Sequence, residues 1–278
     1  MPRKRATKAE MRHRYDTIIE ICNELGPITI RGIYYQLIAR GLFDKSDSAD
    51  AVSNACVKLR INGELPWDLI ADNTRQRQVY QTFESVEHAL EVTALTYRKN
   101  AMKALDINIE FWCEKDALSN LIFPITSKWD IPLIATRGQP SLTLVHDAYK
   151  SLLPNTYIYV LTDFDQSGFE IYNTINHYFT HFINEDGNLS IDDLHIQRIM
   201  LDASQITDWE LITRPPKAKD KKHNFTHCCE LDAIPPQIMR SEVNRYIQKH
   251  VSIPELEQIR DIEAMERKGI REAFSYIR

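Results

Sequence analysis

The segment Tyr157-Ile-Tyr-Val-Leu-Thr-Asp-Phe-Asp-Gln-Ser-Gly168 decides the fold class of this chain. A run of β-branched and aromatic residues leads into two aspartates and a glycine, and residues 168–183 then have helical periodicity. Further β-rich runs lie at 107–112, 131–135 and 195–201, and helical stretches lie between them at 116–127 and 141–152. Strands that alternate with helices predict βαβ units and a mostly parallel sheet, which places this part of the chain in the α/β class.

Acidic residues follow two of these predicted strands. Asp163 and Asp165 come directly after one, and Glu114 follows another. Residues two apart in extended chain point to the same side, and ligands of parallel sheets collect beyond the carboxyl ends of the strands. We therefore expect the three carboxylates to converge on a hard cation, Mg²⁺, for which Mn²⁺ can substitute. The alternative is that the acids only cap the helices that follow them.

The first hundred residues predict helices and one small β-element. Apolar spacing, caps and turn residues place three helices, a turn and an extended stretch at 8–25, 29–40, 48–59, Asn62-Gly63 and 66–72. This order is typical of a winged helix, which docks a helix in a DNA groove. With a helix over 79–104 as the connection, we expect a multi-domain protein with a DNA-binding domain at 1–104. The α/β domain and its C-terminal helices would occupy 105–278.

The predicted helix at 29–40 carries two adjacent tyrosines. On a helical wheel, Tyr34 falls on the apolar face with Ile33, whereas Tyr35 lies on its flank beside Arg31. We therefore expect Tyr34 in the core and Tyr35 exposed. A phenol is rarely ionised at neutral pH, and a neighbouring guanidinium would lower its pKa and hold a phosphate. Two aromatic residues in a helix otherwise indicate core packing.

The charge distribution indicates a polyanionic partner more clearly than the net charge of −5 does. Basic residues gather at 3–14, 58–60, 75–77 and 214–222, and local positive potential is what phosphate binding requires. From the second cluster we predict Lys58 and Arg60 as DNA-binding residues. The 43% apolar content contains no run that could span a bilayer and no secretory signal, so we expect a protein of the cytoplasm without membrane contact. Five scattered cysteines predict reduced thiols.

The acidic motifs resemble the Toprim domain, a Rossmann-like α/β unit of topoisomerases, primases and some nucleases. Together with Arg31-x-Ile-Tyr-Tyr35 in a winged helix, the chain resembles the A subunit of topoisomerase VI and the related meiotic double-strand-break transesterase. The motifs that carry this resemblance cover most of the chain: Arg31 to Tyr35, Glu114, Arg137 to Ser141, Asp163 to Gly168, and Glu230 to Ile234. The compact mini-A relatives are the most similar.

The resemblance implies a DNA topoisomerase of the ATP-hydrolysing type IIB kind, or a related strand-breaking transesterase, associated with nucleoid, plasmid or phage DNA. In a homodimer, Tyr35 of one subunit would attack double-stranded DNA at the metal site of the other and form a 5′-phosphotyrosyl link, with Arg31 beside it. Glu114, Asp163 and Asp165 would hold Mg²⁺. The chain departs from the family in its short N-terminal region, so no ATPase B-type partner is evident. It also has Gln166 where members commonly have proline.

Two other functions stay open on the sequence alone. The metal site could hydrolyse DNA with activated water and leave Tyr35 unused. Alternatively, the chain could bind DNA through its basic clusters without cleaving it, in which case binding would weaken steeply with salt.

Overall fold

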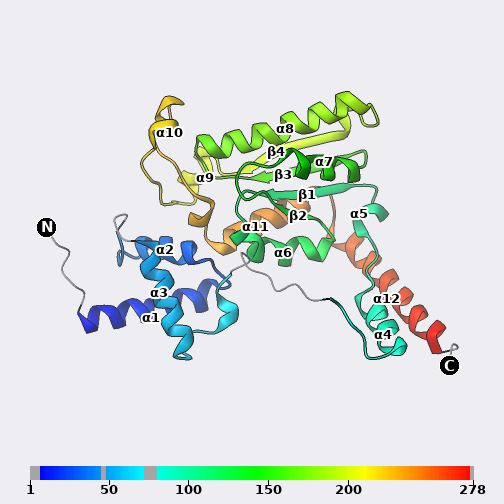
Figure 1. Cartoon of the computed structure of the whole chain (residues 1–278), viewed down its shortest axis with the longest axis horizontal. Helices are drawn as coiled ribbons and strands as arrows, with labels where there is room; N and C mark the ends of the chain where they lie inside the picture. The colour runs from blue at the N-terminus through cyan, green and yellow to red at the C-terminus, as the bar shows by residue number, and fades with distance from the viewer. Residues whose placement is uncertain (1–6, 45–47, 72–79, 276–278) are drawn as a thin grey trace.

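The computed structural model describes residues 7–44, 48–71 and 80–275 and has an α/β architecture built on one parallel sheet (Figure 1). The strands are β1 (Asn108–Cys113), β2 (Leu133–Ala135), β3 (Thr156–Leu161) and β4 (Leu194–Met200). The helices before and between the strands are α1 (Lys8–Leu25), α2 (Ile30–Ala39), α3 (Ala49–Ile61), α4 (Val86–Thr96), α5 (Ala101–Ala104), α6 (Ser119–Thr126), α7 (Leu142–Ser151) and α8 (Gln166–Asp186). Those after the sheet are α9 (Ala203–Asp208), α10 (Ala218–Lys222), α11 (Pro236–Ile247) and α12 (Ile253–Ser275). Among the described helices, none combines the length and apolar character needed to cross a membrane.

The sheet has the strand order β2-β1-β3-β4, and every neighbouring pair is parallel. The prediction of βαβ units is therefore confirmed, and all four predicted strands lie within two residues of those observed. In the central pair, Cys113 of β1 is in register with Leu161 of β3. The residues that follow these two strands consequently emerge side by side at the carboxyl edge of the sheet.

Helices cover both faces of the sheet. Because side chains alternate along each strand, successive residues pack against different layers of helices. Phe111 and Leu161 belong to a buried cluster with α6 and α11, whereas Trp112 and Val160 pack against α7 and α8 around Phe179. Figure 1 shows α7 and α8 on one side of the strands and α6 and α11 on the other. Both faces are apolar, which explains why the strand sequences are nearly continuous hydrophobic runs.

The N-terminal helices α1, α2 and α3 enclose a core of their own. Ile18 and Ile21 from α1, Leu37 from α2 and Leu59 from α3 are fully buried in it. The three predicted helices are confirmed. The predicted β-element contributes, within the described residues, a short 3-10 turn at Trp67–Leu69 and a bridge between Ile28 and Ile70. Residues 72–79, including the basic cluster 75–77, lie outside the described part.

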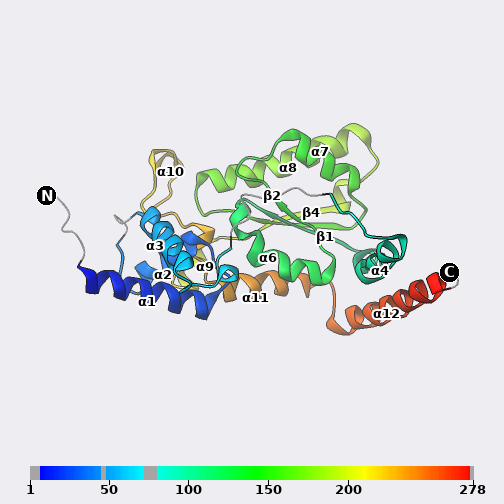
Figure 2. The same ribbon diagram turned by 60° about the horizontal axis from the view of Figure 1, so that its bottom comes forward.

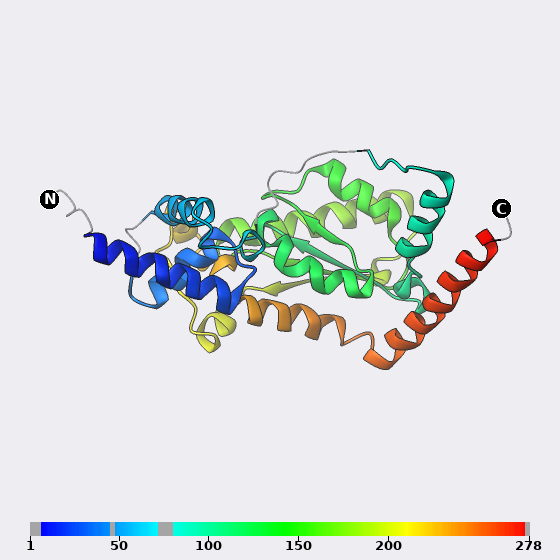
Figure 3. The same ribbon diagram turned by 90° about the horizontal axis from the view of Figure 1, so that it is seen from below.

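The single helix predicted over 79–104 is wrong. Within 80–104, α4 and α5 are separated by residues 97–100, and α4 packs against α12, which extends away from the sheet (Figures 2 and 3). The amide of Lys99 donates to Glu263 of α12 at 2.8 Å, and the hydroxyl of Tyr97 donates to Glu266 at 2.7 Å. The bond from the Lys99 amide, to a helix 164 residues later, takes the place of a backbone bond that would have continued α4.

Candidate active site at the carboxyl edge of the sheet

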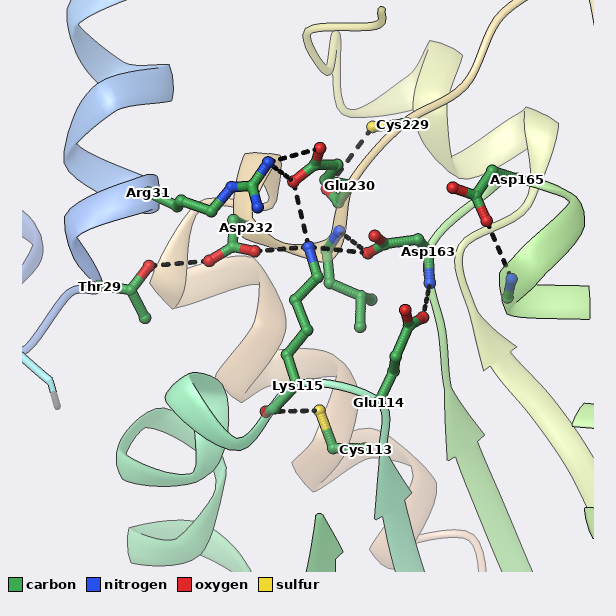
Figure 4. Close-up of polar contacts among 12 residues, drawn as sticks. Thr29, Arg31, Cys113, Glu114, Lys115, Asp163, Asp165, Cys229, Glu230 and Asp232 are labelled. Carbon is green, nitrogen blue, oxygen red and sulfur yellow. Dashed lines mark hydrogen bonds and ion pairs between the residues drawn. The ribbon is translucent and has the colours of Figure 1, made fainter. Parts of the chain in front are cut away.

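Two of the three predicted metal ligands meet where β1 and β3 end. Glu114 follows β1, and Asp163 follows β3 after Thr162. The amide of Asp163 donates to Oε2 of Glu114 at 3.0 Å, so the two residues are in direct contact (Figure 4). The parallel register of the strands is the cause, because it brings both chain segments out at the same level.

Asp165 is placed differently from the other two acids. Its Oδ1 accepts a hydrogen bond from the amide of Gly168 at 2.9 Å and so caps α8, while Oδ2 forms an ion pair with Arg214 at 2.6 Å. Figure 4 shows this bond from the start of α8 to one carboxylate oxygen of Asp165. The capping role considered as the alternative for the acids is therefore observed for Asp165. Among the described residues, no three His, Cys, Asp or Glu side chains are grouped closely enough to hold a metal ion.

Glu114 and Asp163 nevertheless have the properties of cation ligands. Burial raises the pKa of the Glu114 carboxyl to about 7, and the charge of Asp163 adds to the effect. Glu114 forms no ion pair within the described part of the chain. Burial also raises the pKa of Asp163, against the opposing effect of Lys115. Carboxylate oxygens are the ligands that a hard divalent cation prefers, and Glu114 is free of ion pairs within the described residues, whereas Asp163 already pairs with Lys115 and Asp165 with Arg214.

Lys115 is the central cation of the site, and it was not predicted. Its ammonium group lies 2.7 Å from Asp232, 3.0 Å from Asp163 and 3.2 Å from Glu230. Burial opposes its charged form, but Asp232, Asp163 and Glu230 outweigh that effect and raise the pKa of Lys115. The lysine therefore stays charged and neutralises part of an acidic cluster assembled from three segments of the chain.

Helix α2 is attached to this cluster by its first turn. Thr29 accepts a hydrogen bond from the amide of Gly32 at 2.9 Å, and its hydroxyl donates to Asp232 at the same distance. In the same turn, Arg31 forms an ion pair with Glu230 at 2.6 Å. We call the interactions of Glu230 and Asp232 with Thr29, Arg31 and Lys115 the carboxylate clamp. It joins the N-terminal helices to the edge of the sheet.

The expected exposure of Tyr35 is wrong. Only 8% of Tyr35 is exposed, and its ring belongs to the same buried cluster as Leu231 and Phe111, whereas Tyr34 is half-buried. The helical wheel assumed one apolar face, but α2 lies between two cores and buries a second face against residues 105–278. Burial, and then the charge of Glu230, raise the pKa of Tyr35; Arg31 and Lys115 act in the opposite direction. Arg31 thus lowers the pKa of Tyr35 as predicted, but burial and Glu230 raise it by more.

The predicted DNA-binding residues lie on α3. Lys58 is exposed, whereas Arg60 donates to the carbonyl of Trp67 at 2.7 Å and stacks over its ring. Arg60 also lines a cavity of about 710 Å³ between α2, α3 and the sheet edge. The ionisable groups around this cavity are Arg31, Arg60, Glu114, Lys115, Asp116, Arg137 and Asp232. The cavity therefore presents four cations and three carboxylates, of which Lys115 pairs with Asp232 and Arg137 with Asp116.

Sequence reasoning missed Lys115 and Arg214 and gave Glu230 and Asp232 no role. Lys115 directly follows Glu114, so its position was visible, but its carboxylate partners come from segments far along the chain. Arg214 lies in the basic cluster 214–222, and nothing in that stretch of sequence indicates that its side chain points inward to Asp165. The chain matches none of the known protein families against which it was scanned, and a search of curated proteins found no match.

Proposed function

We propose that this protein breaks DNA strands by transesterification with Tyr35 as the nucleophile, as the resemblance to the topoisomerase VI A subunit implies. The observation that carries the proposal is the location of Tyr35. It lies within the electrostatic influence of Arg31 and Lys115, and Lys115 contacts Asp163, which in turn contacts Glu114. A phenol, two cations and two carboxylates at the carboxyl edge of a parallel sheet are the groups that phosphodiester transfer requires.

In the proposed reaction the phenol oxygen of Tyr35 forms a bond to phosphorus, and the bond from phosphorus to the 3′ oxygen breaks. The proton lost by the phenol balances the proton gained by the 3′ oxygen. Arg31 would hold the phosphate by paired hydrogen bonds. A magnesium ion bound by Glu114 and Asp163 would neutralise phosphate charge and stabilise the leaving oxygen. The covalent link conserves bond energy, so resealing needs no ATP. We further propose a homodimer acting on double-stranded DNA, with Lys58 and Arg60 as contacts to its backbone.

A second function is favoured by the burial of Tyr35. Since 8% exposure leaves little room for attack on a polymer, Glu114 and Asp163 could instead support hydrolysis by water, with Tyr35 as a packing residue. Hydrolysis would leave free 5′-phosphates and no protein attached to the DNA.

The test incubates the protein with supercoiled plasmid and Mg²⁺ or Mn²⁺, then compares gels run with and without proteinase. We expect linear or nicked DNA bound to protein, with EDTA preventing the reaction. Tyr35→Phe should abolish the adduct while leaving DNA binding within about twofold, whereas the matched variant Tyr34→Phe should retain adduct formation.

Cleavage without adducts, unchanged in Tyr35→Phe, would support hydrolysis in place of transesterification. Binding without cleavage under all conditions would contradict both enzymatic proposals and leave a DNA-binding module. The three outcomes give different gels from the same set of reactions.

A further inference from the structure

The carboxylate clamp connects the start of α2 to the segment that begins at Glu230. Both carboxylates of the clamp are buried, and each contacts α2 and Lys115 at once: Glu230 through Arg31, and Asp232 through Thr29 (Figure 4). Buried charges of this kind hold a specific arrangement, because separating them leaves uncompensated charge behind. The clamp therefore fixes the position of α2 against the sheet edge.

The position of α2 determines whether Tyr35 is covered. Tyr35 lies one helical turn after Arg31 and belongs to the same buried cluster as Leu231 and Ala233, and α2 packs against the turn Leu231–Ala233 that follows Glu230. The carboxylates that hold α2 and the apolar residues that pack against it thus come from the same four-residue stretch, 230–233. If the ion pair of Arg31 and Glu230 opens, the cover over Tyr35 moves with it.

The two partners in this ion pair differ in their access to solvent. The side chain of Arg31 is 54% exposed, whereas that of Glu230 is 10% exposed. Arg31 also lines the 710 Å³ cavity, where it lies with three further cations and three carboxylates. A phosphate in that cavity can reach the guanidinium without entering the core. Guanidinium groups bind phosphate and carboxylate with the same paired geometry, so the two anions compete for Arg31.

We propose that Glu230 and Asp232 are positioning residues which keep Tyr35 covered until a phosphate group takes Arg31 from Glu230. This inference rests on the proposed function, because it supplies the step by which a buried nucleophile becomes available to DNA. It assigns the carboxylates no contact with the reacting atoms. Free enzyme would thereby be protected from attacking DNA before a phosphate is in place.

The experiment measures the accessibility of Tyr35 by nitration with tetranitromethane and peptide mass spectrometry, in a Tyr34→Phe background so that one phenol is counted. We expect Glu230→Gln to increase nitration of Tyr35 on the order of tenfold, the effect of losing a charged hydrogen bond. Glu242→Gln breaks another arginine–glutamate pair, with Arg245 on α11, and should leave nitration unchanged.

A second arm adds inorganic pyrophosphate, a small phosphate probe that cannot shield the ring as DNA would. Compared with sodium chloride at equal ionic strength, it should increase nitration of Tyr35 in the Tyr34→Phe protein. Unchanged nitration in Glu230→Gln would overturn the role of the clamp, and no response to pyrophosphate would overturn the trigger. None of these measurements requires DNA cleavage. Failure of the clamp proposal can therefore be distinguished from failure of the proposed activity.

Discussion

Replacement of Lys115 by methionine tests the energetic role of the central cation. The side chain keeps its length and apolar stem but loses the charge that Asp163, Glu230 and Asp232 share at 3.0, 3.2 and 2.7 Å. Removal of one partner from a buried ionic cluster leaves uncompensated charge and costs about 3–5 kcal/mol. Domains are typically stable by about 5–15 kcal/mol, so the variant should lose a large part of its stability.

The assay is urea unfolding followed by circular dichroism, with the free energy of unfolding extrapolated to water. The matched control is Lys268→Met, which removes an exposed lysine whose partner Glu272 lies 3.7 Å away on the same helix. Such surface pairs contribute at most about 1 kcal/mol. If Lys115→Met loses no more than Lys268→Met at an unchanged m-value, the three carboxylates are stabilised by something other than Lys115, and the account of the clamp is incorrect.

Three further changes test the fold and its charges. Burial lowers the pKa of His250, so the unfolded chain binds the proton more readily; stability should be full above about pH 6.5 and decline as pH falls through that value, and His250→Gln should flatten this decline in thermal melts between pH 5 and 8. Phe179→Ala empties a fully buried site between the sheet and α8, and should lower the free energy of unfolding in urea by about 3–5 kcal/mol; a loss below about 1 kcal/mol would contradict the packing. Gly168→Ala would place a methyl group 2.1 Å from the carbonyl oxygen of Asp163, so it should lower the melting temperature by several degrees and reduce plasmid cleavage, whereas Gly269→Ala, with open space around it, should do neither.

The sheet could be predicted from the sequence because its determinants are local. The run before Asp163 is apolar on both faces and ends at an acid, and the next residues begin a long helix that Asp165 caps. Similar apolar runs before Glu114 and at the other strands alternate with helices, and this alternation predicted a parallel sheet. Apolar runs, helix caps and periodicity each involve residues close together in the chain, so they can be recognised in a single sequence.

The site could be predicted only in part, because its decisive contacts are between distant segments. Glu114 and Asp163 lie together because they follow neighbouring parallel strands, which the sequence indicates. The exposure of Tyr35 depended on a second surface packing against α2, and no periodicity in α2 reveals that surface. The paired state of Asp165 likewise depended on Arg214, 49 residues later.

The ion pair of Arg31 with Glu230 joins residues 199 positions apart in the chain. At roughly 5–20 residues per second, a ribosome needs about 10–40 s to make the intervening stretch. Residues 230–233, which pack against α2, are therefore made long after the helix that carries Tyr35. A nascent or prematurely ended chain would lack this stretch. Tyr35 would therefore be open to modification until synthesis has passed Glu230.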